Sequence, residues 1–202
     1  ISETYHFGGV SGHSVRILAA AQTPDNMGWY QGTADAVRQN LRHLIDSPGR
    51  PEHVLILAGD HLYRMDYRKM IDFHRERGAD ITVGVVPVES DQASRFGILC
   101  AGRDGRVTRF VEKPQTEEAL AGLDSDLRDP GDAAPETAAR PLLASMGIYV
   151  FKAEVLVDKV SDAANVDFGE HILPRSIQTD AVYGYLFDGY WEDIGTIRSF
   201  YE

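Results

Sequence analysis

The strongest constraint on the fold is His53–Ala58 (HVLILA), a continuous apolar run that is followed directly by Gly59 and Asp60. An apolar run such as Val54–Ala58 is typical of a central parallel strand that is buried on both faces of a sheet. Ligands of open α/β sheets collect beyond the carboxyl ends of such strands. The run therefore predicts a buried strand and a functional position for the residues behind it.

Helices are predicted on either side of this strand. Apolar residues recur at helical spacing from Thr33 to Ile45, with Thr33 as the N-cap and an end near 47–49. A second helix is predicted up to Arg77, starting at Asp66 or Tyr67, and Gly78 suits the position after its end. The β-branched run Asp80–Val88 is the next strand. This alternation favours an α/β sheet with right-handed connections.

The second half of the chain shows a different pattern of predicted elements. Two short strands, Gly97–Cys100 and Val107–Val111, flank the turn Asp104–Gly105 and predict a hairpin. The Pro-, Ala- and Asp-rich residues 115–141 predict a mobile surface loop with a short helix at Glu117–Ala121. Further strands are predicted at Val15–Ala21, Leu143–Phe151 and Ala181–Phe187, and further helices at Ala153–Val160, Phe168–Ile177 and from Gly195 onward. The expected fold class is a Rossmann-like α/β domain: a mixed, mostly parallel sheet flanked by helices.

Composition narrows the classes of function. The chain has 202 residues, 43% hydrophobic and 25% charged, which suits one soluble domain with a substantial core. Its formal net charge of −11 argues against nucleic acid or an anionic membrane as a partner, because both need a positive face. We expect a cytoplasmic protein, because no transmembrane run or signal-peptide pattern occurs and Cys100 is the single cysteine. An acidic protein that handles phosphates needs local cations or a metal ion.

Two carboxylates lie close to glycines at the ends of predicted elements. Asp60 follows Gly59, and Asp193 lies between Trp191 and Gly195 near a predicted helix start. Each aspartate alone is equally well explained as a turn or cap residue. Two carboxylates together with substrate phosphates and waters make an ordinary Mg²⁺ site. The pair is therefore the candidate metal site, and Mg²⁺ is the expected cofactor.

Two further positions suit the recognition of a phosphate or a base. Lys113 ends a predicted strand before Pro114, so its ammonium can offer a point charge to a phosphate. A solvated surface lysine is the ordinary alternative. Gly32 precedes the first predicted helix and allows a phosphate or base edge to approach the helix N-terminus. A Gly-Thr pair before a helix is also a common cap, so each signal is weak by itself.

Six segments follow one another in a recognisable order: WYQGTADAV (29–37), LAGDH (57–61), FVEKP (110–114), ASMGIYVF (144–151), DFGEHILP (167–174) and YWEDIGT (190–196). The order resembles the nucleotidyltransferase domain of ADP-glucose pyrophosphorylases, within the sugar nucleotidyltransferase family. The resemblance extends from about Val15 to the end of the chain. AGD, VEKP and the W-x-D-I-G-T element occur across the wider family, whereas WYQGTADAV, ASMGIYVF and DFGEHILP point to the ADP-glucose branch.

The resemblance implies roles for individual residues. Asp60 and Asp193 match the Mg²⁺-binding aspartates, and Asp60 and Lys113 are the expected catalytic residues. Lys113 matches a lysine that contacts the phosphate of glucose 1-phosphate, and Glu112 a residue that hydrogen-bonds the sugar. The implied substrate-binding residues are Glu112, Lys113, Ser145 in the glucose pocket, Tyr30, Gly32, Thr33 and Asp35 near the base, and Gly59. The implied reaction is in-line attack of glucose 1-phosphate on the α-phosphorus of ATP, giving ADP-glucose for glycogen or starch synthesis and pyrophosphate.

The chain also departs from the family pattern. The family opens with a Gly-rich loop of the type GGGxGxRLxPLT that supplies a catalytic arginine, whereas Gly8–Gly12 holds no arginine and follows no predicted strand. Residues 1–202 are therefore expected to be a partial nucleotidyltransferase domain without the first strand and the C-terminal β-helix domain. Such a piece is expected to be inactive alone. The resemblance implies a homotetramer for the full-length protein.

Three other interpretations stay open from the sequence. The nucleotide is UTP, dTTP or GTP in other members of the wider family. A regulatory, non-catalytic subunit of the same family is a second alternative, although such a subunit has no need to keep Asp60, Lys113 and Asp193 together. A plain α/β binding domain is the third. The density of family motifs favours the enzyme.

Overall fold

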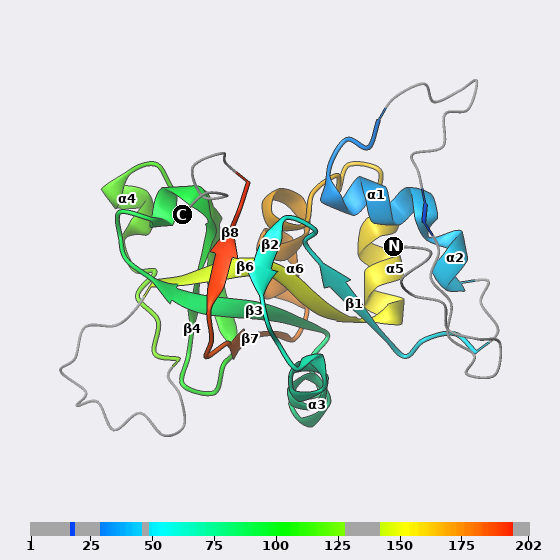
Figure 1. The fold of residues 1–202 in the computed structure, drawn as a ribbon, viewed down its shortest axis with the longest axis horizontal. Helices are drawn as coiled ribbons and strands as arrows, with labels where there is room; N and C mark the ends of the chain where they lie inside the picture. The colour runs from blue at the N-terminus through cyan, green and yellow to red at the C-terminus, as the bar shows by residue number, and fades with distance from the viewer. Residues whose placement is uncertain (1–16, 19–28, 46–48, 128–141, 196–202) are drawn as a thin grey trace.

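The computed structural model describes residues 17–18, 29–45, 49–127 and 142–195. One mixed sheet forms its centre with helices around it, which confirms the predicted α/β class (Figure 1). The strands follow the order β5-β4-β6-β3-β7, and β1 pairs with β6 beside that path. These strands are β1 His53–Leu57, β3 Ile81–Val88, β4 Gly97–Ala101, β5 Val107–Glu112, β6 Leu142–Lys152 and β7 Val182–Leu186. A separate two-stranded sheet contains β2 His61–Tyr63 and β8 Trp191–Asp193.

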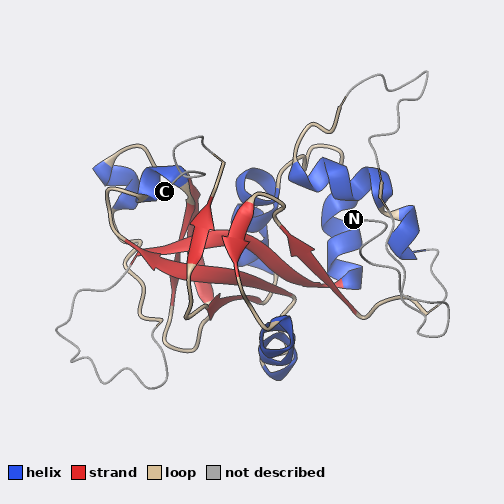
Figure 2. Ribbon diagram, in the orientation of Figure 1, coloured by secondary structure: helices blue, strands red, loops and turns tan. Residues whose placement is uncertain are grey.

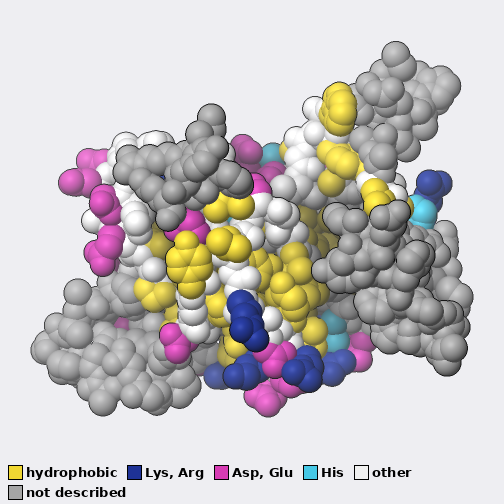
Figure 3. All heavy atoms as spheres, in the orientation of Figure 1, with side chains coloured by type: hydrophobic (Ala, Val, Ile, Leu, Met, Phe, Trp, Pro, Cys, Tyr) yellow, Lys and Arg dark blue, Asp and Glu magenta, His cyan; other side chains and the backbone are white. Residues whose placement is uncertain are grey.

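The helices gather at the two ends of the sheet and along its sides. α1, α2 and α5 lie beside β1, and α4 lies at the opposite end, as Figures 1 and 2 show. Basic and acidic side chains lie together over α3, which is visible at one edge of Figure 3. The helices are α1 Thr33–Asn40, α2 Arg42–Ile45, α3 Tyr67–Glu76, α4 Glu117–Leu120, α5 Ala153–Ser161 and α6 Leu173–Thr179, with a 3₁₀ turn at Ala93–Arg95 and a π turn at Phe168–Ile172.

Most helices begin where the sequence predicts. Asp66 caps α3 by accepting the Arg68 backbone N–H at 3.1 Å, and Gly78 follows the helix with a φ of 58°. The predicted helix from Thr33 is instead divided at Leu41 into α1 and α2. Its N-cap is Gly32 and not Thr33, because the Thr33 hydroxyl bonds to another segment (below). The expected end near 47–49 lies mostly outside the described residues.

The prediction that His53–Ala58 forms a central parallel strand is wrong. Among the described strands β1 pairs with β6 alone, and the pairing is antiparallel. Its apolar run has a different cause: Val54 and Ile56 pack on one hydrophobic cluster, whereas Leu55 packs on the other. A strand needs apolar residues on both faces whenever both faces are covered, whether or not it is central.

The balance of strand directions also differs from the expectation of a mostly parallel sheet. Within the described part of the chain, β3 and β7 form a parallel pair, and the other pairings of the main sheet are antiparallel. The hairpin of β4 and β5 around Gly105 accounts for one of these pairings, as predicted. The other antiparallel pairings are those of β6, which lies in the middle of the sheet and pairs with β1, β3 and β4.

β6 changes its neighbour half way along its length. On one edge it pairs first with β4, through Leu143 and Ala144, and then with β1, from Ile148 to Lys152. Between the two lies Gly147, whose φ of 66° is in the left-handed region that glycine tolerates best. The register against β3 shifts at the same place. The sheet is therefore opened between β4 and β1, and the ends of several elements face this opening.

Several other predictions are modified. Pro174 lies in the first turn of α6, where a proline is tolerated, so the helical segment after Phe168 continues beyond it. Residues 115–127 are not simply a surface loop, since Leu123 and Ser125 are fully buried and the Ser125 hydroxyl bonds both backbone groups of Ala101. The remainder of that segment, 128–141, lies outside the described residues, as do most of the predicted strand at Val15–Ala21 and the predicted helix after Gly195.

Candidate functional site

A cleft of about 550 Å³ lies where β6 changes its neighbour. Its walls come from the ends of β1 and β5, the beginnings of α1 and β4, the middle of β6 and the end of β8. Seven of the candidate residues line it together: Thr33, Gly59, Asp60, Glu112, Lys113, Ser145 and Asp193. The structure thus brings into one place residues that are up to 160 positions apart in the sequence (from 33 to 193).

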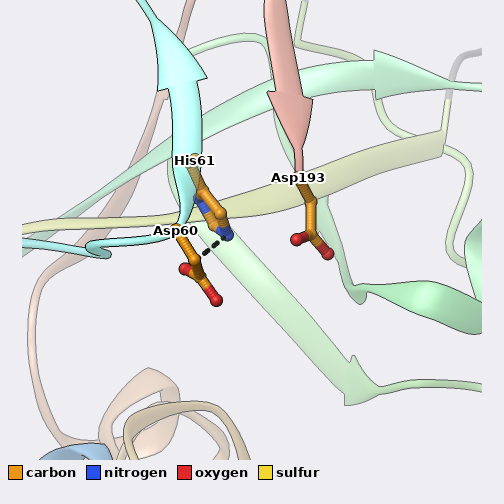
Figure 4. Close-up of side chains that lie close together, drawn as sticks. All are labelled: Asp60, His61 and Asp193. Carbon is orange, nitrogen blue, oxygen red and sulfur yellow. Dashed lines mark ion pairs between the residues drawn. The ribbon is translucent and has the colours of Figure 1, made fainter. Parts of the chain in front are cut away.

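The acidic pair is assembled by the small sheet. β2 and β8 are antiparallel, with His61 opposite Asp193, and the Ile194 N–H donates to the Asp60 carbonyl at 3.1 Å. Asp60, His61 and Asp193 each place a ligand atom within 4.8 Å of the others (Figure 4). The Asp60 side chain is 67% exposed, so it is free to turn toward a cation. Two carboxylates and a histidine nitrogen at these separations fit a divalent metal.

His61 was not singled out by the sequence reasoning. Its Nδ1 lies 2.8 Å from the carbonyl oxygen of Met146, and its Nε2 lies 3.5 Å from Asp60 Oδ1. Its ring meets Trp191 edge to face, with centroids 5.3 Å apart, and a Cβ added at Gly147 would lie 3.2 Å from its Cε1. The histidine follows Asp60 in the LAGDH segment, but only the contacts in three dimensions show that it faces the same site.

Lys113 stands at the end of β5 in an unusual conformation. Its φ is 44°, and it is the one non-glycine residue with positive φ among the described residues. The backbone is held there because the Lys113 N–H donates to the Phe96 carbonyl at 3.1 Å. Its Nζ lies 3.9 Å from Glu112 Oε1, while the side chain remains 61% exposed. Such backbone strain persists where the surroundings enforce it and is common at functional sites.

Glu112 is packed against two glycines. A Cβ at Gly97 would lie 2.7 Å from Glu112 Oε2, and one at Gly169 would lie 2.5 Å from the same atom. Burial raises the pKa of the Glu112 carboxyl; the Lys113 charge opposes this, and the Asp167 charge adds to it. Only residues without a side chain leave room for the carboxylate, so its position is specified by the backbone around it.

Ser145 and Tyr149 lie on the same strand, β6, and both line the cleft. Their side chains are hydrogen-bonded to each other, and burial raises the pKa of Tyr149 to about 12. The phenol therefore stays protonated at neutral pH. The predicted glucose-pocket serine thus faces the cleft with a neighbour that keeps it in place.

The first turn of α1 is tied to the segment before the π turn. The Thr33 hydroxyl donates to Asp167 Oδ2 at 2.9 Å, and the Ala34 and Asp35 N–H groups donate to the Val166 carbonyl at 3.0 and 3.1 Å. A Cβ on Gly32 would collide with that same carbonyl. The backbone donors that were expected to face a phosphate or base are therefore occupied, and the glycine makes room for protein backbone.

The other candidates of this segment do not line the cleft. Asp35 is buried, and its carboxylate accepts from the Gln31 N–H at 2.8 Å, from Gln39 Nε2 at 2.9 Å and from Arg38. The Tyr30 hydroxyl accepts from Asn40 at 2.9 Å. These contacts stabilise the first turns of α1, so a role near the base is not supported by the position of these side chains.

Two charged residues line the cleft without having been predicted as site residues. Arg95 stacks over the Phe96 ring, with its guanidinium carbon 5.1 Å from the centroid, and Nη2 lies 3.9 Å from Glu192. Asp167 receives the Thr33 hydroxyl and caps the π turn through Gly169 N. The DFGEHILP segment was a signal for Asp167, whereas no motif in the sequence pointed to Arg95.

The fold and the cleft define an α/β protein with a metal-competent acidic pair and two cationic side chains around one site beyond the strand ends. The chain belongs to the nucleotidyl transferase family, whose model matches residues 1–202. Members of this family take a nucleoside triphosphate and a sugar phosphate as substrates, and they generally use a divalent metal such as Mg²⁺. Among the described residues, no helix combines the length and the apolar character that a membrane span requires.

Proposed function

We propose that this domain transfers an adenylyl group from ATP to glucose 1-phosphate, giving ADP-glucose and pyrophosphate. The observation that carries the proposal is the convergence of Asp60, Asp193 and Lys113 on one cleft. Membership of the nucleotidyl transferase family supports the reaction type. The choice of adenine and glucose is supported by the WYQGTADAV, ASMGIYVF and DFGEHILP segments, which resemble the ADP-glucose branch.

Asp60 and Asp193 would hold Mg²⁺. Their carboxylates come from different elements, face the same volume and keep oxygen atoms free for a hard cation that takes its other ligands from phosphates and water. A bound Mg²⁺ would neutralise charge on the triphosphate and help to align the reacting groups. The net charge of −11 makes this contribution necessary, because the protein itself repels a polyanion.

The side chains of the opposite wall would position the sugar phosphate. Lys113 offers a point charge to the phosphate, and Glu112 and Ser145 offer hydrogen-bonding groups to the sugar hydroxyls. A phosphate oxygen of glucose 1-phosphate would attack the α-phosphorus of ATP, and the bond from that phosphorus to the β-phosphate oxygen would break as pyrophosphate leaves. Since no protein nucleophile is needed, catalysis would depend on alignment and on charge stabilisation.

The proposal is tested by measuring pyrophosphate release by the complete gene product with glucose 1-phosphate and each of ATP, UTP, dTTP and GTP. We expect turnover with ATP to exceed that with the other three by at least tenfold. A preference for one of the others would replace the nucleotide assignment and keep the reaction class. No turnover with any nucleotide, combined with normal folding, would favour the regulatory subunit.

The cellular setting follows from the same resemblance. We propose that the product serves glycogen or starch synthesis in the cytoplasm and that the complete protein is a homotetramer. Sedimentation equilibrium of the complete gene product tests the second statement. A monomer or dimer across the micromolar range would contradict it.

A further inference from the structure

We infer that His61 is a third protein ligand of the metal, through Nε2, and that it makes the site favour transition-metal ions such as Mn²⁺ and Co²⁺ relative to Mg²⁺. The inference rests on the proposed function, since it assigns the metal to Asp60 and Asp193. It goes further because it adds a nitrogen ligand to an oxygen site and predicts which ions bind best.

The hydrogen bond of Nδ1 determines which nitrogen of His61 is available. The partner of Nδ1 is the Met146 carbonyl oxygen, at 2.8 Å, and a carbonyl oxygen only accepts. Nδ1 must therefore carry the proton in the neutral ring, and the lone pair is left on Nε2. Metal-binding histidines commonly donate their other ring N–H to a backbone carbonyl in this way, which fixes the tautomer and the ring orientation.

The ring is also held by packing. The His61 side chain is 13% exposed, and Trp191 meets it edge to face. At Gly147 an added Cβ would lie 3.2 Å from His61 Cε1, so the backbone there is already close to the ring. A ligand that is oriented before the metal arrives loses little side-chain entropy on binding.

The carboxylate oxygens near Nε2 favour the binding of a cation. Nε2 lies 3.5 Å from Asp60 Oδ1, and the ligand atoms of Asp60, His61 and Asp193 are all within 4.8 Å of one another. In the neutral ring the Nε2 lone pair has carboxylate oxygens as neighbours, and a cation between these groups would be attracted by all three. An octahedral ion with bonds of about 2.1 Å separates its ligands by roughly 3 Å or 4.2 Å, so small movements of these side chains complete the site.

The chemistry of the donors determines the preference among ions. Mg²⁺ is a hard cation that binds oxygen and keeps its waters, and an imidazole nitrogen adds little to its binding. Affinity for nitrogen-containing sites rises along the first transition series from Mn²⁺ to Co²⁺ and beyond. A site of two carboxylates and one imidazole therefore gains more with Co²⁺ or Mn²⁺ than with Mg²⁺.

Two measurements on the purified chain test the inference. Electron spin-echo envelope modulation of bound Mn²⁺ reports whether a nitrogen is bonded directly to the ion. Calorimetric titration with Co²⁺ and with Mg²⁺ alone gives the ratio of the two affinities. The variants are His61→Asn, whose amide can still donate to the Met146 carbonyl but lacks Nε2, and Asp60→Asn. His43→Asn, on α2 and away from the cleft lining, is the matched control.

We expect a nitrogen signal in the wild type and in His43→Asn and its loss in His61→Asn. The Co²⁺-to-Mg²⁺ affinity ratio should fall at least tenfold in His61→Asn, with a small change for Mg²⁺. Mn²⁺ binding that is weakened by Asp60→Asn but shows no nitrogen signal in the wild type overturns the inference and leaves the proposed metal pair intact. No Mn²⁺ binding, or binding unaffected by Asp60→Asn, overturns both.

Discussion

Lys113 combines an unfavourable backbone conformation with a charge that faces the cleft. Replacing it with glutamine removes the charge, so we expect the KM for glucose 1-phosphate to rise at least tenfold. The unfavourable positive φ remains in this variant, so the melting temperature should change little. Lys113→Gly should lose the same affinity but gain about 1 kcal/mol of stability, because glycine tolerates a φ of 44°. Thermal unfolding and steady-state kinetics measure both effects. Lys69→Gln, at an exposed position of α3, is the control, and an unchanged KM for Lys113→Gln would remove Lys113 from phosphate binding.

Glu112 is expected to lower the stability of the protein at neutral pH. Burial raises the pKa of its carboxyl in the folded state, so as the pH rises the unfolded chain loses this proton before the folded chain does. The stabilisation from the protonated form is therefore present below the unfolded pKa and is lost as the pH rises through the folded pKa. Glu112→Gln should raise the melting temperature at pH 7, and the gain should shrink toward pH 4.

The same substitution is expected to weaken binding of glucose 1-phosphate, because the carboxylate is the proposed partner of the sugar. Stability and binding would then change in opposite directions in one variant. Glu118→Gln, on α4, is the control for removing a carboxylate that lies outside the cleft lining. A lower melting temperature for Glu112→Gln at pH 7 would contradict the argument.

The bend of β6 depends on Gly147 and also supports the site. Its φ is 66°, and an added Cβ would lie 3.2 Å from both Ala58 Cβ and His61 Cε1. Gly147→Ala should therefore cost about 1–2 kcal/mol of stability and also displace His61, which weakens Co²⁺ binding. Gly78→Ala is a matched control, since its φ of 58° carries the same strain but no atom lies within 4 Å of the added Cβ. Equal effects of the two variants on Co²⁺ binding would show that crowding of His61 is unimportant.

His74 links the acid stability of the whole molecule to the packing of α3 on the sheet. Its ring is buried, with Nδ1 2.8 Å from the Thr82 hydroxyl and the ring 4.9 Å from that of His53. Burial lowers the pKa of His74 to about 4, and the neighbouring charges of His53 and Lys152 act in the same direction. The unfolded chain therefore takes up a proton first as the pH falls.

The consequence is a loss of stability between about pH 6.5 and pH 4, reaching on the order of 3 kcal/mol. His74→Asn should flatten this part of the pH profile, because asparagine can still bond Thr82 and does not titrate in this range. Urea unfolding at several pH values measures the difference. A wild-type profile that is flat from pH 6.5 to 4 would contradict the assignment.

Local sequence predicted most of the element types, and family motifs indicated part of the cleft lining. The end of α3 before Gly78, the hairpin around Gly105 and the strand Ile81–Val88 depend on neighbouring residues, so periodicity and turn chemistry predicted them. Family motifs indicated the candidates that line the cleft, and all of these except Ser145 lie at or near the end of an element. Seven of the ten distinct candidates line the cleft, since Tyr30, Gly32 and Asp35 are used in local contacts instead.

Tertiary structure alone decided how these pieces meet. The run His53–Ala58 requires apolar contacts on both faces, but only the return of β6 determines that β1 pairs with it antiparallel. The pairing of β2 with β8 brings His61 opposite Asp193, although 132 positions (193 − 61) separate these two residues in the sequence. The sequence specifies the chemical group that each side chain carries. The distances between these groups depend on which strands pair, and that depends on the whole chain. For that reason the acidic pair was predictable from sequence, and its histidine neighbour became visible only in the folded protein.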